Sequence, residues 1–269
     1  MDFRKAKFIL PNLFTLTSVV AGVFSVHLST TSTSASEMTL AAWLIVVAVF
    51  CDISDGRVAR LTKTESQLGI QLDSFADAIS FGVAPAFLLY HWGLFYWGAA
   101  GVFISSLFVC ATVLRLARFN VSTSTGGESK RYFLGLPTPL AAGTVVSAVL
   151  AHLSYTGTAT TGATASVAAI SLVISALMVS NVKYRSFKDV NLRGVAVTRA
   201  FAIVGAIVAA SVLLKPSITF VLLFFAYIII GLLGGVVSLG KHLLGNDLTL
   251  DGLEDSDDDE ILLAESTKR

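Results

Sequence analysis

The feature that most constrains this chain is a series of apolar segments, each about 20 residues long, that follow one another from residue 10 to residue 240. An apolar segment of about 20 residues is long enough for an α-helix to cross the hydrocarbon core of a bilayer. Membrane-spanning β-strands would instead alternate apolar and polar side chains over about ten residues, and these segments do not alternate. The sequence therefore predicts an all-α, polytopic integral membrane protein.

Composition supports this class, since 54% of the 269 residues are hydrophobic and only 14% are charged. A soluble domain usually carries about 25% charged residues. We expect about eight transmembrane helices, with a tight turn near residues 92–94 between the third and the fourth. The expected ranges are 10–29, 39–59, 71–91, 95–115, 138–155, 163–180, 196–214 and 217–240.

The distribution of basic residues predicts the orientation of these helices. Eight spans place all but one of the 19 Lys and Arg residues on one side of the membrane, and Lys215 is the exception. Basic loops stay in the cytoplasm, and an even number of spans puts both ends of the chain on the same side. We therefore expect a multi-pass protein of the cell (inner, cytoplasmic) membrane with both termini in the cytoplasm.

The chain divides into a membrane domain, residues 1–245, and an acidic tail, residues 246–269. Acidic runs such as residues 255–260 are typical of solvated, disordered segments. The first apolar segment follows basic residues but is interrupted by Pro11 and Asn12, and no small-residue cleavage site follows it. We interpret it as a retained first helix and not as a cleaved signal.

Four aspartates lie in two consecutive predicted spans, Asp52 and Asp55 in the second, Asp73 and Asp77 in the third. Ionisable groups within a span are costly and indicate function. Spacings of three and four residues put each pair on one face of its helix. Because the two spans run in opposite directions, both pairs should lie near the cytoplasmic side, with four carboxylates in one small volume.

Such a group of carboxylates would repel strongly at low dielectric and needs a positive partner. Arg57 and Arg60 are close in sequence and are one choice. Carboxylates without His or Cys are also the ligands of hard cations such as Mg²⁺ or Mn²⁺, which complete their coordination with substrate phosphate oxygens. Gly56 and Gly69 have no side chain to keep a large ligand from the backbone. The pattern indicates metal-dependent phosphoryl chemistry.

Residues 52–77 read Asp-x2-Asp-Gly-x2-Ala-Arg-x8-Gly-x3-Asp-x3-Asp, which resembles the signature of the CDP-alcohol phosphatidyltransferase family. The resemblance implies a homodimer that uses Mg²⁺ or Mn²⁺, with two ions in the site. It implies metal ligation by Asp52, Asp55 and Asp73, and it gives Asp77 two roles, ligand of the second ion and catalytic general base. The residues implied in binding the CDP-lipid are Asn12, Gly56, Ala59, Arg60 and Gly69.

Further stretches resemble the serine-using branch of this family; they are residues 10–15, 80–86, 115–120, 135–139 and 178–184. The resemblance implies transfer of the phosphatidyl group of CDP-diacylglycerol to the hydroxyl of L-serine, with release of CMP and an active site that faces the cytoplasm. The serine carboxylate needs cationic and polar partners. Our candidates are Arg118, Asn120, Asn181 and Lys183.

Two alternatives remain open at this point. Within the family, the acceptor alcohol could be glycerol 3-phosphate, inositol phosphate or choline. In a different class, a divalent-cation transporter would explain aspartates within the membrane, but not their shared depth or the Gly-x2-Ala-Arg sequence. The expected partners are CDP-diacylglycerol, L-serine and membrane lipid, and no nucleic acid.

Overall fold

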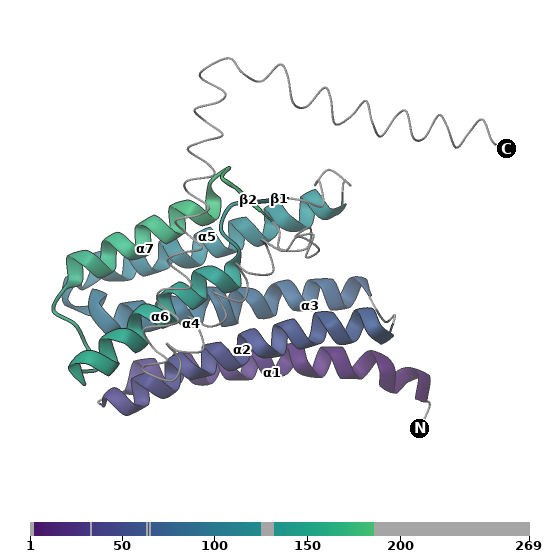
Figure 1. Cartoon of the computed structure of the whole chain (residues 1–269), viewed down its shortest axis with the longest axis horizontal. Helices are drawn as coiled ribbons and strands as arrows, with labels where there is room; N and C mark the ends of the chain where they lie inside the picture. The colour runs from purple at the N-terminus through teal and green to yellow at the C-terminus, as the bar shows by residue number, and fades with distance from the viewer. Residues whose placement is uncertain (1–2, 33, 63, 65, 125–131, 186–269) are drawn as a thin grey trace, which may run out of the picture.

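The computed structural model describes residues 3–32, 34–62, 64, 66–124 and 132–185, which form a bundle of antiparallel helices (Figure 1). The main helices are α1 (Phe3–Thr31), α2 (Ala35–Thr62), α3 (Gln67–Asp77), α4 (Ala84–Leu89), α5 (Ala99–Ser124), α6 (Thr138–Thr156) and α7 (Thr164–Val179). Between α3 and α5 the chain stays helical through the π-helices η1 (Ala78–Val83) and η2 (Tyr90–Leu94) and the 3₁₀ turn η3 (Phe95–Trp97). Two short strands, β1 (Tyr132–Leu134) and β2 (Lys183–Arg185), complete this part.

The prediction of a multi-pass helical membrane protein is confirmed for the part of the chain that the structure describes. Each of the first six expected spans coincides with a helical segment, and 5 of these segments are long and apolar enough to cross a bilayer. The sixth, α7, is apolar but only 16 residues long. The expected spans 196–214 and 217–240 and the tail 246–269 lie outside the described residues.

The tight turn expected near residues 92–94 is wrong. The helix continues through Trp97, and the break comes at Gly98, whose φ is 51°. Gly93 is buried in the bundle, and an added Cβ would lie only 2.7 Å from a methyl carbon of Val167 on α7. The absence of a side chain at Gly93 therefore allows close packing between helices, and Gly98 adopts the positive φ at which the helix breaks.

The helical segment from α3 to η3 is held closely between α1 and α5. Its π-helix η1 begins directly after Asp77, and π-helical turns are frequent at functional sites. A Cβ added to Gly22 of α1 would lie 3.0 Å from the Cα of Ser80, and one added to Gly82 would lie 3.0 Å from a methyl carbon of Thr112 on α5. Both contacts fix the segment that carries two of the four aspartates.

The core of the bundle contains large side chains from several helices, among them Met38 and Ile45 of α2, Phe81 of η1, Leu88 of α4 and Phe108 of α5, all fully buried. Buried alanines lie between them on α2 and α6. Small residues of this kind let membrane helices approach closely enough for van der Waals packing.

The helical bundle also contains one short two-stranded ladder. Strands β1 and β2 pair antiparallel, with Leu134 opposite Lys183, so the chain entering α6 is joined to the chain leaving α7. Gly135, whose φ is 77°, follows β1 and donates its backbone N–H to the carbonyl of Val182 at 2.9 Å. The ladder closes the α6–α7 hairpin at the same end of the bundle as the α2–α3 connection (Figure 1).

Candidate functional site

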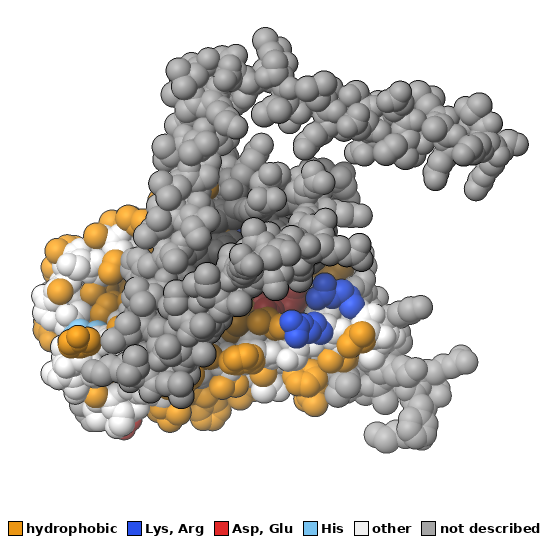
Figure 2. Space-filling model, viewed as in Figure 1, with side chains coloured by type: hydrophobic (Ala, Val, Ile, Leu, Met, Phe, Trp, Pro, Cys, Tyr) orange, Lys and Arg blue, Asp and Glu red, His pale blue; other side chains and the backbone are white. Residues whose placement is uncertain are grey.

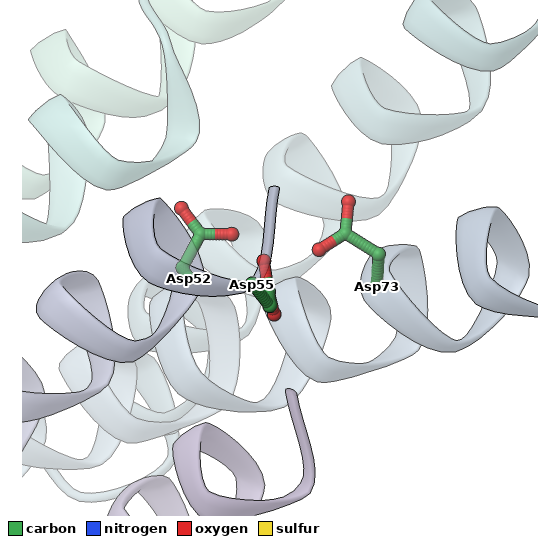
Figure 3. A group of neighbouring side chains, drawn as sticks. All are labelled: Asp52, Asp55 and Asp73. Carbon is green, nitrogen blue, oxygen red and sulfur yellow. The ribbon is translucent and has the colours of Figure 1, made fainter. Parts of the chain in front are cut away.

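Three of the four aspartates meet at the contact between α2 and α3. Each of Asp52, Asp55 and Asp73 offers a carboxylate oxygen, and these oxygens lie within 4.8 Å of one another. Figure 3 shows Asp55 between Asp52 and Asp73, with the outer two side chains turned toward each other. Asp55 is buried and the other two are half-buried. We refer to these three side chains as the acidic cluster.

The fourth aspartate, Asp77, lies beside this cluster and is not part of it. Its carboxyl group contacts Asp52 through a side-chain hydrogen bond and is close enough to Arg115 of α5 for an attractive electrostatic interaction. Arg115 also donates a short hydrogen bond from Nη1 to the hydroxyl of Thr138 at the start of α6. Asp77 is therefore held between a carboxylate and a guanidinium, at a junction of α2, α3, α5 and α6.

The acidic cluster suits a hard divalent cation. Its donors are carboxylate oxygens alone, and they are near enough to one another to share one ion. Arg60, the alternative positive partner, donates from Nε to the carbonyl oxygen of Gly56 at 2.9 Å, which holds its side chain along α2. Figure 2 shows Lys and Arg side chains beside acidic ones on this face of the molecule. The site thus offers both a cation-binding cluster and fixed positive charge.

A cavity of about 580 Å³ adjoins the acidic cluster, and residues of α1, α2, α3 and α5 line it. Its size is typical of sites for small molecules and cofactors. All five residues predicted to bind the CDP-lipid lie in its wall, together with the three aspartates of the cluster; they are Asn12, Gly56, Ala59, Arg60 and Gly69.

The start of α3 shapes one wall of this cavity. Ser66 is the N-cap of α3, and its hydroxyl oxygen accepts a hydrogen bond of 3.0 Å from the backbone N–H of Gly69. A Cβ added to Gly69 would lie 3.2 Å from that hydroxyl and 3.8 Å from Oδ1 of Asn12 on α1. The glycine thus lets α1 approach the first turn of α3, whose backbone N–H groups favour anions.

Several residues of the site had no role predicted from the sequence. Thr15 of α1 donates from its hydroxyl to Oδ2 of Asp55 at 2.7 Å and, like Thr64, Ser66 and Phe119, lines the cavity. The only signal for Thr15 was its place in the family-like stretch 10–15, three residues after Asn12. The sequence does not reveal which face of α1 turns toward α2.

The predicted serine-binding residues make contacts in different places. Arg118 donates from Nη2 to the amide oxygen of Asn181 at 2.7 Å, beyond the end of α7. Asn120 turns instead toward α3 and donates from Nδ2 to the hydroxyl of Ser74 at 2.8 Å, next to Asp73. For Lys183 the structure describes the backbone, which pairs with Leu134 in the two-stranded ladder.

Comparison with known proteins relates the matched part of the chain to one enzyme family. The family model described as CDP-alcohol phosphatidyltransferase matches residues 8–179, a range that contains all four aspartates. A CDP-diacylglycerol–serine O-phosphatidyltransferase of Helicobacter pylori is 40% identical over 183 residues, which cover 68% of this chain and 74% of the relative.

Two further relatives are more distant. An archaetidylserine synthase of Methanothermobacter thermautotrophicus is 35% identical over 177 residues, which cover 65% of this chain and 69% of the relative. A CDP-diacylglycerol–serine O-phosphatidyltransferase of Mycobacterium tuberculosis is 33% identical over 150 residues, which cover 55% of this chain and 51% of the relative.

Proposed function

This chain belongs to the CDP-alcohol phosphatidyltransferase family, and on that premise we propose that it transfers the phosphatidyl group of CDP-diacylglycerol to the hydroxyl of L-serine and releases CMP. The observation that carries the proposal is the acidic cluster of Asp52, Asp55 and Asp73 in the wall of a cavity of about 580 Å³. The names of the relatives supply serine as the acceptor. Membership of this family sets the cation-transporter alternative aside.

The proposed membrane arrangement has eight spans in the cell membrane, both termini in the cytoplasm and an active site that opens to the cytoplasm. The basic residues support it, since Arg57 and Arg60 lie near the end of α2 and Arg115 and Arg118 near the end of α5. These helix ends share one end of the bundle in Figure 1, and basic residues mark the cytoplasmic side. The homodimer implied by the family resemblance stays a prediction.

The proposed metal is Mg²⁺ or Mn²⁺, with two ions in the working site. Asp52, Asp55 and Asp73 would hold the first, and Asp77 would contribute to the second. A bound divalent ion supplies positive charge to the pyrophosphate oxygens and to the departing CMP.

The cavity residues would bind the nucleotide while the acyl chains of the lipid stay in the bilayer. Gly56, Ala59 and Gly69 leave the helix backbone open to a bulky ligand. Arg60 presents a planar guanidinium, which suits two oxygens of a pyrophosphate. Asn12 closes the cavity from α1 and can accept or donate hydrogen bonds to the base or ribose.

The proposed chemical step is an in-line displacement at the lipid-side phosphorus. The serine hydroxyl oxygen forms the new P–O bond while the bond to CMP breaks, and CMP leaves with the electron pair. Asp77 takes the hydroxyl proton. Because a carboxylate is a weak base for an alcohol, the proton transfer accompanies the attack instead of preceding it. The contacts of Asp77 with Asp52 and Arg115 keep its carboxylate in place.

The proposed serine site is formed by Arg118, Asn120, Asn181 and Lys183. Arg118 pairs with the serine carboxylate, since guanidinium and carboxylate form charge-assisted hydrogen bonds. Asn181 holds the guanidinium at 2.7 Å. Asn120 contacts Ser74 beside Asp73, which links this region to the acidic cluster.

The experiment that tests the function supplies purified protein in detergent with CDP-diacylglycerol and radiolabelled L-serine, with and without Mn²⁺ or Mg²⁺. We expect labelled lipid and CMP only when the metal is present. Labelled glycerol 3-phosphate, inositol phosphate and choline serve as competing acceptors. Labelled lipid from one of these and none from serine would contradict the proposed acceptor.

A further inference from the structure

A threonine of the first helix reaches into the acidic cluster. Thr15 of α1 and Asp55 of α2 are both buried, with exposed fractions of 5% and 6%, and the distance between Thr15 Oγ1 and Asp55 Oδ2 is 2.7 Å. The same hydroxyl lies 3.2 Å from the carbonyl oxygen of Pro11. A hydroxyl has one proton to donate, and the shorter contact to a charged acceptor is the stronger. The hydroxyl of Thr15 therefore donates its hydrogen bond to the Asp55 carboxylate.

This contact governs the orientation of the Asp55 carboxylate. Rotation of an aspartate carboxylate about its last bond is broad and weakly restrained. A donor fixed on Oδ2 restricts that rotation and keeps Oδ1 available. Figure 3 shows Asp55 between Asp52 and Asp73, with one of its oxygens directed toward the space between them and the other directed away.

The hydroxyl of Thr15 is itself held in place by the packing of α1. Ser18, one turn further along the same face, donates to the hydroxyl of Ser80 at 3.1 Å, and Ser80 donates to the carbonyl oxygen of Ser18 at 2.9 Å. Gly22 packs against the backbone of Ser80. Because α1 is fixed against η1 in this way, Thr15 is a donor on a rigid helix.

We propose that Thr15 is a positioning residue that holds the Asp55 carboxylate in its cation-binding orientation, so that α1 sets the affinity of the site for divalent metal. The inference rests on the proposed function, in which the acidic cluster holds the catalytic metal. Removing a residue that hydrogen-bonds a metal ligand typically weakens metal binding or activity about 10- to 100-fold.

The direct test measures Mn²⁺ binding to the purified full chain in detergent. The electron paramagnetic resonance signal of free Mn²⁺ gives the unbound concentration at each step of the titration. Thr15→Val keeps the shape of the side chain and removes the hydroxyl, and we expect its dissociation constant for Mn²⁺ to rise about 10-fold. Thr15→Ser restores a hydroxyl and should bind Mn²⁺ nearly as the unaltered protein does.

Thr112→Val is the matched control. Thr112 is as buried as Thr15, but within the part of the chain that the structure describes its hydroxyl donates to the carbonyl oxygen of Phe108 on its own helix, at 2.9 Å, and to no carboxylate. Its replacement should leave Mn²⁺ binding unchanged. Should Thr15→Val fail to fold, Thr15→Cys serves in its place, since a thiol is a weak donor.

A second readout separates positioning from a direct part in the reaction. With Thr15→Val, the Mn²⁺ concentration that gives half-maximal transfer to serine should rise about 10-fold, while the rate at saturating Mn²⁺ recovers. A folded Thr15→Val protein with unchanged Mn²⁺ affinity overturns the proposal, as does a lost maximal rate without a change in affinity.

Different measurements test the proposed transfer to serine and the proposed role of Thr15. If the unaltered protein binds Mn²⁺ but transfers nothing to serine, the proposed function is wrong. The affinities of the Thr15 variants still decide the role of Thr15 in that case.

Discussion

Arg118 near the end of α5 and Asn181 beyond α7 are joined by a hydrogen bond of 2.7 Å from the guanidinium Nη2 to the amide oxygen. Nη1 of Arg118 also lies 3.4 Å from the carbonyl oxygen of Val179. The amide of Asn181 thus restrains a long side chain that is exposed at the end of the bundle. A restrained guanidinium loses less conformational entropy when it binds a carboxylate.

The first prediction concerns this pair. Arg118→Lys keeps the positive charge but loses the planar arrangement of donors, so the KM for serine should rise about 10-fold, the ratio equivalent to 1.4 kcal/mol. The KM for CDP-diacylglycerol should stay the same. Asn181→Ala should raise the serine KM by a smaller factor. Steady-state kinetics with each substrate varied in turn checks both, and an unchanged serine KM in Arg118→Lys would dismiss the role of Arg118.

The second prediction concerns Asp77. Asp77→Asn removes the proposed proton acceptor with little change in shape, so kcat should fall by about 10²- to 10⁴-fold. Binding of the CDP-lipid should remain, because the residues proposed to bind it lie along α1, α2 and the start of α3. Turnover and nucleotide-lipid binding are measured on the same preparation. Activity near that of the unaltered protein would refute the assignment of Asp77 as the base.

The third prediction concerns metal removal. Chelation with EDTA should abolish transfer to serine, and added Mn²⁺ or Mg²⁺ should restore it, because the acidic cluster needs a cation to bind a pyrophosphate. Asp52→Asn takes one carboxylate from the cluster and should require a higher metal concentration for half-maximal activity. Full activity after exhaustive chelation, with metal content checked by elemental analysis, would exclude this role of the cluster.

The fourth prediction concerns the sharp connection between the third span and α5. A Cβ added to Gly101 would overlap the backbone carbonyl of Leu94, which cannot move aside as a flexible side chain could. Gly101→Ala should therefore destabilise the protein by about 1–3 kcal/mol and lower its melting temperature in detergent. Gly162→Ala is the control, since an added Cβ there meets nothing within 4 Å. Equal melting temperatures for the two variants would contradict the close contact.

The parts of the fold that the sequence predicts are those set by local periodicity. The length of each apolar segment predicts a span, and spacings of three and four residues put each aspartate pair on one helix face. The structure brings Asp52, Asp55 and Asp73 together, as the antiparallel arrangement of two successive spans requires. Asp77 lies beside the cluster, with a side-chain hydrogen bond to Asp52 and an electrostatic interaction with Asp73. Its spacing in the sequence does not distinguish this position from a place within the cluster.

The features that the sequence misses depend on packing between distant segments. Gly93 was interpreted as part of a turn, but its missing side chain makes room for Val167 of α7. Strands β1 and β2 have three residues each, too few for an alternating pattern to be recognised. The contact of Thr15 with Asp55 requires knowledge of which face α1 turns toward α2.

Because Pro11, Asn12 and Thr15 line the cavity, the first helix is one of its walls and not a simple tether to the membrane. A shortened protein that began after Thr15 would keep every residue of the aspartate signature and still lose one wall of the cavity that we propose for the CDP-lipid. Work on this enzyme should leave that end of the chain unaltered.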